Sequence, residues 1–265
     1  GIAIVGYPLL DPPQLQRVRI KPTDDPSSSG SYVLMSIDVT HGIILENGSR
    51  AIYVHIKDCN VVGGIVDSSR LAETANVLVS KCAIVGDIRV LVRGSLVLDS
   101  CHVVGHVSAG WSDAQLTVVN CDIKGDNTGT GVASEGFPNI NQAWIYGNRI
   151  TGFTRGIGIV AENNVYVRHN SVEGSAIYGV MIEQSNEAYV DSNRIERCGD
   201  GIVMNTNGFV RNNTITRSTG TGMRIGGGNI SGVFVRGNVV TGGSGNGIEV
   251  VSELEGGSVS NNTVA

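Results

Sequence analysis

A short pattern of apolar and polar positions repeats along most of the chain. Each copy has an apolar residue, two variable residues, an asparagine or a cysteine, one variable residue, and then valine or isoleucine. Successive copies are 19 to 27 residues apart. The residues at the asparagine or cysteine position are Cys59, Cys82, Cys101, Cys121, Asn148, Asn170, Asn193, Asn213, Asn238 and Asn262.

A second signal lies eight or nine residues after each of the later asparagines, where a glycine precedes alternating apolar residues, as in Gly179-Val180-Met181-Ile182. Alternation with period two and many β-branched residues predict short strands, and no amphipathic stretch of helical period competes. Short strands cannot bury an apolar face alone, but stacked copies bury a continuous core. We therefore predict an all-β chain.

The predicted architecture is a single-stranded parallel β-helix, a solenoid of about ten to eleven turns with an Asn/Cys ladder, because each copy holds about 20–25 residues. It covers residues 41–265, and residues 1–40 form an irregular N-terminal segment. The longest insertion between copies, Asp122–Ala143, is expected to be a loop where binding is added to a rigid scaffold. Solenoid ends normally need a cap, so we expect either a longer protein or a partner that caps this one.

The ladder residues have a predicted structural role. The asparagines point inward at a tight turn, because Asn tolerates the left-handed αL conformation and its amide can bond to the turns above and below. At the four cysteine positions, buried unpaired thiols, a disulfide and a metal site are the three alternatives. Free cysteine behaves as a small buried hydrophobe, which favours unpaired thiols.

The V-x-x-N-x-V/I frame resembles the asparagine ladder of right-handed parallel β-helices in the pectate-lyase-like superfamily. The resemblance covers about residues 40–265 and implies a fold, which carries many functions. Members that act on acidic polysaccharides usually have their chemistry outside the first-strand sheet, here the strand after each glycine. Their motifs are absent from this sequence: N-T-D, D-D, G-H-G and R-I-K of polygalacturonases, R-x-P-x-x-R of pectate lyases and Y-G-x-D-P-H of alginate epimerases.

Three charged residues are the candidates for catalysis if the protein is an enzyme: Arg224, Glu249 and Glu183. All three should face outward on or just after the first-strand sheet. A lyase or epimerase needs a base beside a cation that neutralises the sugar carboxylate, and Arg224 with Glu249 on the next turn suits that need. Glu183 and Glu249 are about 14 Å apart by strand spacing, too far for two-carboxylate glycoside hydrolysis. An ordinary cross-strand ion pair is the alternative.

The strongest functional signal is a row of five aromatic residues, one in each of five consecutive turns. Each lies four residues before a ladder asparagine and between two inward apolar positions, so it must face out. The members are Trp144, Tyr166, Tyr189, Phe209 and Phe234. A contiguous apolar stripe usually marks an interface.

Three interpretations of this row remain open. It packs against neighbouring β-helices in a homo-oligomer, a segment of the same chain covers it, or sugar rings of a glycan stack on it. The positions two residues after the aromatic row are mostly arginine: Arg168, Arg211 and Arg236, with Asp191 interrupting. They form either a polar rim or a site for an anionic glycan.

Composition narrows the classes of function. Apolar residues make up 41%, which argues against disorder. The net charge of −5 disfavours nucleic acid as a partner, and no apolar run reaches the roughly 18 residues that membrane insertion requires. The histidines show no metal-ligand spacing, so no metal and no cofactor is expected.

The leading functional hypothesis is a β-helix protein of a virion or surface assembly, similar to a phage tail spike or minor tail protein. It would contribute structure and contact a host glycan, as a homotrimer or with neighbouring subunits, on a virion or at an extracellular or cell surface. One alternative is a polysaccharide lyase, epimerase or hydrolase of the pectate-lyase-like class, and enzymatic activity stays undecided. Another is a purely structural cell-surface rod.

Overall fold

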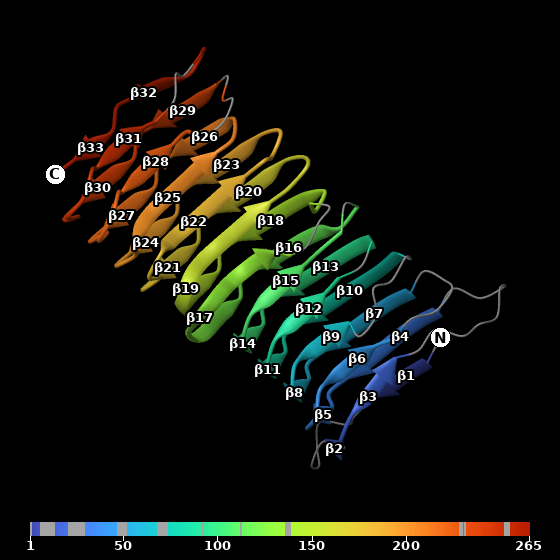
Figure 1. Ribbon diagram of the computed structural model, residues 1–265. Coiled ribbons are helices and arrows are strands. Elements are labelled where there is room, and N and C mark those ends of the chain that lie inside the picture. The colour runs from blue at the N-terminus through green and yellow to red at the C-terminus, as the bar shows by residue number, and fades with distance from the viewer. Residues whose placement is uncertain are drawn as a thin grey trace.

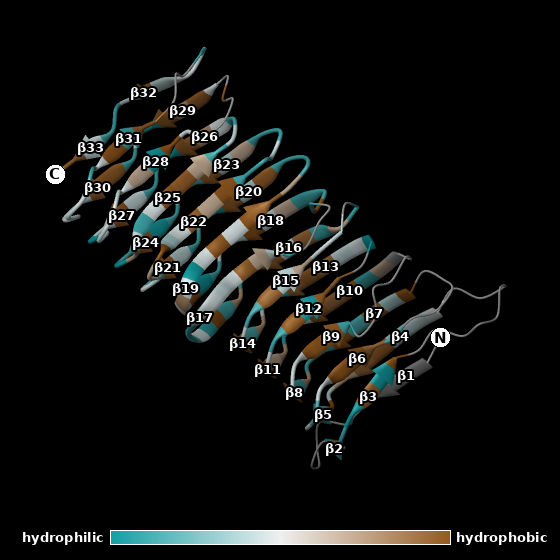
Figure 2. Ribbon diagram, in the orientation of Figure 1, coloured by the Kyte–Doolittle hydropathy of each residue, from teal (hydrophilic) through white to brown (hydrophobic). Residues whose placement is uncertain are grey.

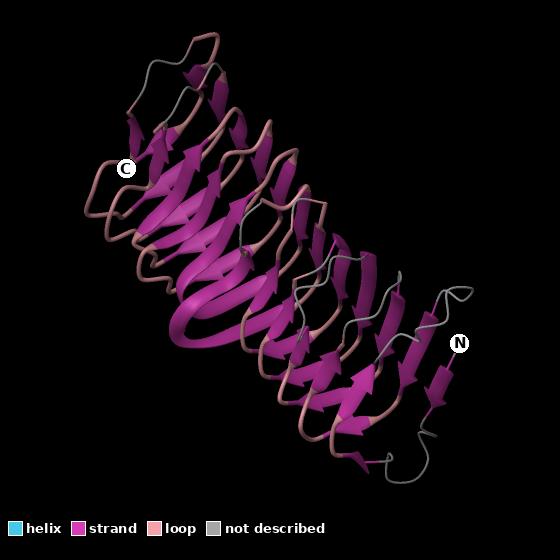
Figure 3. Cartoon of the chain, turned by 45° about the vertical axis from the view of Figure 1, so that its right-hand side comes forward, coloured by secondary structure: helices cyan, strands magenta, loops and turns pink. Residues whose placement is uncertain are grey.

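The structure is a computed structural model that describes residues 2–5, 14–20, 30–46, 52–67, 74–91, 93–111, 113–135, 139–227, 230, 232–251 and 255–265. The regular structure of these residues consists of β-strands. The strands wind into an elongated solenoid whose two ends carry the two termini (Figure 1). Figure 3 shows the same stack of parallel strands from a second direction. The predicted parallel β-solenoid is confirmed.

Among the described residues, one face of the solenoid, face A, is a sheet of 12 strands. Each strand pairs in parallel with the equivalent strand of the next turn, as β20 does with β23. The strands of face A are β1 (Ile2–Val5), β4 (Gly30–Met35), β7 (Ile52–Lys57), β10 (Thr74–Ser80), β13 (Arg93–Asp99), β16 (Gln115–Val119), β18 (Gln142–Tyr146), β20 (Val165–Arg168), β23 (Ala188–Asp191), β26 (Gly208–Arg211), β29 (Val233–Arg236) and β32 (Ser258–Ser260).

In the same part of the chain, the other two faces, B and C, form one 21-stranded sheet. They are joined because two long strands run along both faces, β17 (Asp122–Ser134) and β19 (Arg149–Val160). The remaining strands of face B are β2 (Gln14–Leu15), β5 (Asp38–Val39), β8 (Asn60–Val62), β11 (Ala83–Val85), β14 (His102–Val104), β21 (Ser171–Glu173), β24 (Arg194–Glu196), β27 (Thr214–Thr216), β30 (Val239–Thr241) and β33 (Thr263–Val264). Those of face C are β3 (Val18–Ile20), β6 (Ile43–Leu45), β9 (Ile65–Asp67), β12 (Ile88–Val90), β15 (Val107–Ala109), β22 (Tyr178–Glu183), β25 (Asp200–Asn205), β28 (Met223–Ile225) and β31 (Ile248–Val250).

The solenoid extends upstream of the predicted boundary at residue 41. Strand β4 pairs with β7 on face A, β5 with β8 on face B, and β3 with β6 on face C. The register aligns Leu34 with Ile56 and Val39 with Val61, which gives buried Ile37 the ladder position of this turn. The repeat is hard to see here in the sequence because an aliphatic residue replaces the asparagine or cysteine.

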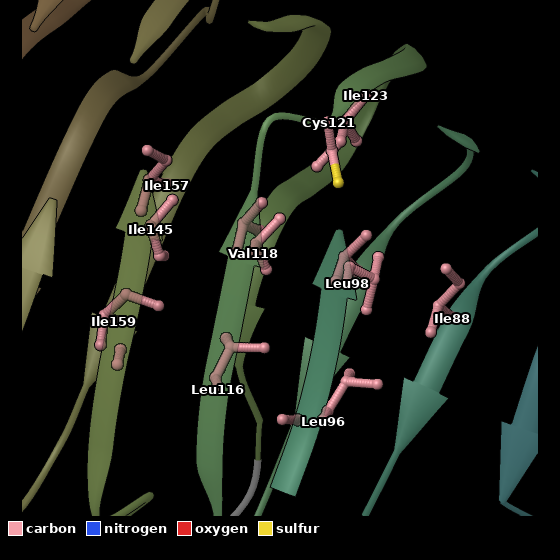
Figure 4. Close-up of a cluster of buried hydrophobic side chains, with 14 of the residues drawn as sticks. Ile88, Leu96, Leu98, Leu116, Val118, Cys121, Ile123, Ile145, Ile157 and Ile159 are labelled. Carbon is pink, nitrogen blue, oxygen red and sulfur yellow. The ribbon is translucent and has the colours of Figure 1, made fainter. Parts of the chain in front are cut away.

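The inward side chains of the three faces form one continuous core. Equivalent positions in successive turns are filled by aliphatic residues, such as Leu98, Val118 and Ile145 on face A (Figure 4). Apolar residues lie along many strands, and polar residues lie in many turns (Figure 2). The period-two alternation of the sequence therefore packs each β-branched side chain against its copy one turn away.

The ladder residues lie in the tight turn between faces A and B, but the predicted conformation of the asparagines is wrong. The residue before each one adopts the left-handed conformation, as with φ of 57° at Ser192 and 56° at His169. The ladder asparagines are not among the described residues with positive φ. Residue types as different as Lys81, Ser100 and Gly147 take the left-handed place. Asparagine is therefore required for its amide and not for its backbone.

Asn193 shows how the amides connect the turns. Its Nδ2 donates to the carbonyl oxygen of Val167 (2.8 Å) and to Oδ1 of Asn213 (3.0 Å). Its Oδ1 accepts from the backbone nitrogen (2.9 Å) and from Nδ2 (3.0 Å) of Asn170. The same four bonds recur at Asn170, Asn213 and Asn238, and all ladder asparagines except the terminal Asn262 are buried. The stack satisfies polar groups that are closed off from water.

The cysteines continue the ladder as free, buried thiols, which confirms the interpretation favoured from the sequence. Each ladder thiol donates to the carbonyl oxygen two residues earlier, as Cys82 does to Ser80 (3.2 Å). A hydrogen bond with the neighbouring Cys101 thiol, together with burial, raises the pKa of the Cys121 thiol. Burial also raises the pKa of Cys198, which lies outside the ladder.

We expect all five thiols of the native protein to be unreactive toward Ellman's reagent, because each side chain is buried and a bulky disulfide reagent cannot reach it. Denaturation should expose five thiols per chain without any reductant. The thiols are counted by absorbance before and after unfolding, with a reduced sample as the control. A count that rises only after reduction would show that a disulfide joins two turns.

Candidate functional site

The five predicted aromatic residues stand side by side on the outer surface of face A. Strand pairing aligns Trp144, Tyr166, Tyr189, Phe209 and Phe234 in one row, which we call the aromatic ladder. Four of the side chains are half-buried and Phe234 is 40% exposed. The outward direction inferred from the alternation is thus confirmed.

The rings of the aromatic ladder are stacked on one another. Centroids of consecutive rings are 6.0, 4.9, 5.3 and 5.2 Å apart, and the planes differ by 9° to 15°. Flat rings at this separation cannot lie side by side in one plane, so they overlap in an offset stack. Each ring is therefore offset from its neighbour, and the five rings form one continuous column along face A.

A row of charged residues borders the aromatic ladder on one side. The Arg168 guanidinium lies 5.2 Å from the Tyr166 ring centroid and 5.4 Å from that of Tyr189, within cation–π range. Arg211 pairs with Asp191 (Nε–Oδ2, 3.1 Å). Although burial acts in the opposite direction, hydrogen bonds from Ser192 and Asn212 and the charge of Arg211 lower the pKa of Asp191.

Polar side chains fix the tyrosines on the other side. The Tyr189 hydroxyl donates to Glu187, a bond that raises the pKa of the tyrosine. Asn164 Nδ2 donates to the Tyr166 hydroxyl oxygen (3.3 Å). The ladder is thus an apolar strip held between two polar borders, and its tyrosine hydroxyls are engaged within the chain.

Toward the N-terminus, the same outward row changes from aromatic to smaller residues and the surface becomes hollow. His55, Leu78 and Val97 occupy the row in successive turns. They line a groove of about 300 Å³ together with Tyr53, Asn76 and Ser95. The change in side-chain size along one row was visible in the sequence, but the groove itself depends on the register between turns.

The catalytic candidates lie on face C. Arg224 and Glu249 are adjacent in register and form an ion pair (Nε–Oε2, 3.3 Å). Arg224 also pairs with Asp200 of the preceding turn (Nη1–Oδ2, 3.2 Å). Glu183 lies in a different row and accepts a hydrogen bond from Asn205 (3.1 Å). The structure therefore brings Arg224 and Glu249 together, whereas Glu183 stays apart.

This arrangement limits what Arg224 can do for catalysis. Two carboxylates already neutralise its guanidinium, so a substrate carboxylate would have to displace one of them. The three side chains are partly exposed, with Arg224 43% and Glu249 33% accessible. Such pairs contribute about 0–1 kcal/mol to stability and are common on protein surfaces.

A second hollow, of about 370 Å³, lies on face C near β12, β15 and β17. Asp87, Arg89, His106 and Glu135 are among the residues that line it. Sequence reasoning missed it because these residues come from three turns and share no motif. The one available signal was the succession of small outward residues, Ser108 and Ala133, after Arg89.

Two further observations concern the described residues only. Within them, no three His, Cys, Asp or Glu side chains are grouped so that they could hold a metal ion. No segment of this part of the chain is a helix with the length and apolar character needed to cross a membrane.

Comparison with known proteins supports the fold. Residues 110–264 match a family described as the right-handed β-helix region. No curated protein and no solved structure gives a significant match. The matched segment covers more than half of the 265 residues, including the asparagine ladder and the aromatic ladder. The chain therefore belongs to the right-handed β-helix family.

Proposed function

We propose that the protein is a structural β-helix of a virion or surface assembly, and that it packs as a homotrimer through face A. The observation that carries this proposal is the aromatic ladder. Five large rings in contact with one another form a continuous apolar strip on face A, and such strips are characteristic of interaction sites. Aromatic residues and arginine are also the residues enriched at protein interfaces.

The geometry of the stack favours a protein partner over a glycan along the ladder. A sugar ring packs on an open aromatic face, whereas each of these rings has a neighbouring ring stacked against it. Aliphatic side chains of a second rod can pack along such a column of rings. Host-glycan contact, if the assembly makes it, would use another part of the surface.

A polysaccharide lyase or epimerase is the weaker candidate. The adjacent Arg224 and Glu249 favour it, but Asp200 occupies the same guanidinium.

The experiment is the solution mass of the wild type by light scattering, compared with Tyr166→Ser/Tyr189→Ser/Phe209→Ser. We expect a trimeric wild type and a monomeric variant, because the variant replaces the central three rings by small polar side chains. The matched control is Val62→Ser/Val85→Ser/Val104→Ser, which removes three exposed apolar residues from face B. This control should stay trimeric.

Circular dichroism separates loss of assembly from loss of fold. If the triple variant unfolds, Phe234→Glu provides the same test, since this ring is at the end of the stack and 40% exposed. A monomeric wild type, or a folded face A variant that keeps the wild-type mass, would contradict the proposal.

A further inference from the structure

The four ladder cysteines lie in consecutive turns and form a column of sulfur atoms. Each precedes the first paired residue of its face B strand, so strand pairing places each cysteine beside the next. Equivalent side chains of paired strands are about 4.8 Å apart. The backbone nitrogen of Cys101 also donates to Cys121 Sγ (3.4 Å), and hydrogen bonds connect the thiol of Cys82 with those of Cys59 and Cys101. We call Cys59, Cys82, Cys101 and Cys121 the thiol column.

Neither packing nor hydrogen bonding singles out cysteine for these turns. Ile37 holds the equivalent position in an earlier turn, so an aliphatic side chain packs there. Asparagine holds it in the later turns and makes four hydrogen bonds, as Asn193 does. A thiol is smaller than isoleucine and a weaker donor than an amide. What it adds is affinity for soft metal ions, among them copper(I).

The spacing of the thiol column suits an ion with two ligands in a line. Copper(I) and silver(I) form such complexes with sulfur. A metal–thiolate bond is about 2.3 Å long, as at zinc, so two in line span about 4.6 Å. This is close to the strand spacing of about 4.8 Å, so an ion between two adjacent turns fits without moving either strand. Two ligands suffice for such an ion, so it is compatible with the lack of a three-residue metal cluster among the described residues.

The surroundings of the thiols suit a monovalent ion. Cys82 Sγ donates to the carbonyl oxygens of Ser80 (3.2 Å) and Ile56 (3.5 Å), which are favourable neighbours for a cation. When one ion binds a pair of cysteines, one S–H bond breaks and its proton goes to water. The thiolate and the second thiol each donate an electron pair to the metal. One positive charge replaces another, so the buried site stays neutral, copper stays in its +1 state, and the cost of burying a net charge is avoided.

An ion can reach the thiol column from the surface because the ladder turn is one residue deep. Exposed Lys81 and Ala83 flank Cys82, and exposed Ser100 and His102 flank Cys101. A bare ion is much smaller than Ellman's reagent, so small local openings of the turn admit the ion and still exclude the reagent.

We propose that the thiol column binds two copper(I) ions, one between Cys59 and Cys82 and the other between Cys101 and Cys121. Two separate pairs use all four sulfurs, whereas an ion between the middle two would leave the outer thiols without one. Each ion joins two turns, so the metal stabilises this part of the rod. The sites lie inside the solenoid, so copper binding does not depend on assembly through face A.

The reduced protein is titrated with copper(I) under nitrogen in the presence of bathocuproine disulfonate, whose colour reports the copper that the protein does not hold. We expect the wild type to withhold two ions per chain, Cys101→Asn/Cys121→Asn one, and the fourfold variant that adds Cys59→Asn/Cys82→Asn none. Asparagine is the replacement because it fills this position in the later turns, and circular dichroism checks the fold. Copper(I) should also raise the melting temperature of the wild type and not that of the fourfold variant.

The matched control is Cys198→Ala, which removes the buried thiol outside the thiol column and should still withhold two ions. If the fourfold variant is unfolded, the two double variants carry the same test, with one ion expected for each. The proposal is overturned if the wild type withholds fewer than two ions, or if the folded variants withhold as many as the wild type. It is also overturned if copper(I) lowers the melting temperature, because the ion then binds the thiols of the unfolded chain and not the paired turns.

Discussion

Replacing Asn193 by alanine should lower the free energy of unfolding by about 3–5 kcal/mol. The substitution removes four hydrogen bonds from a side chain that is 2% exposed. It also leaves the backbone nitrogen of Asn170 and the carbonyl oxygen of Val167 without their partner, in a place that water cannot reach. Each buried group left unsatisfied costs about 1–3 kcal/mol, which makes the loss larger than the net value of the bonds.

The measurement is urea unfolding followed by circular dichroism, with two comparison variants. Asn193→Cys should lose less, because a thiol fills this slot in four turns and donates to a nearby carbonyl oxygen, as Cys121 does to Val119 (3.2 Å). Asn262→Ala should lose about 1 kcal/mol, because the terminal Asn262 is partly exposed and water can replace its bonds. Equal losses at positions 193 and 262 would refute burial as the cause.

The ladder could be predicted from the sequence because its signal is local. Each of the ten turns places the asparagine or cysteine two residues before a β-branched residue, so the frame is recognisable without knowing how the turns align. The outward direction of the aromatic residues follows from the same frame, since Tyr166 lies between Val165 and Val167, both fully buried.

The features that depend on the register between turns could not be predicted. The second partner of Arg224 is Asp200, at the start of β25, and the variable turns between them hide this contact in the sequence. The hollow next to Arg89 likewise needs the alignment of three turns with different lengths. The sequence predicts the left-handed conformation at the ladder asparagine because asparagine tolerates it, whereas the structure has this conformation at the preceding residue. The amide hydrogen bonds that hold the asparagine form only between stacked turns.

The expected loop Asp122–Ala143 is also different in the structure. Its first part is the strand β17, which pairs with β19 despite a register shift between Lys124 and Thr128. The Phe137-Pro138 pair within the predicted loop lies outside the described residues. Phe153 of β19 is the largest fully buried side chain among the described residues, and its ring lies where a Cβ on Gly125 or Gly131 of β17 would stand.

Phe153→Ala should therefore lower the free energy of unfolding by about 3–5 kcal/mol, the usual cost of removing a buried aromatic side chain. The extra hydrogen-bonded length of β17 and β19 limits how far the turn can collapse, so the cavity should persist and the loss should lie at the upper end. Phe153→Leu keeps most of the volume and should cost only about 1–1.5 kcal/mol in urea unfolding.

The same substitution also tests the coupling between this core residue and the surface hollow. The Phe153 ring packs against His106, so its removal frees the imidazole on one side, while the bond to Thr130 remains. The His106 ring resonances in NMR spectra should shift in the alanine variant, and those of His55 on face A should not. An alanine variant as stable as the leucine variant would mean that the turn closes around the missing ring, and that β17 and β19 are less rigid than their pairing indicates.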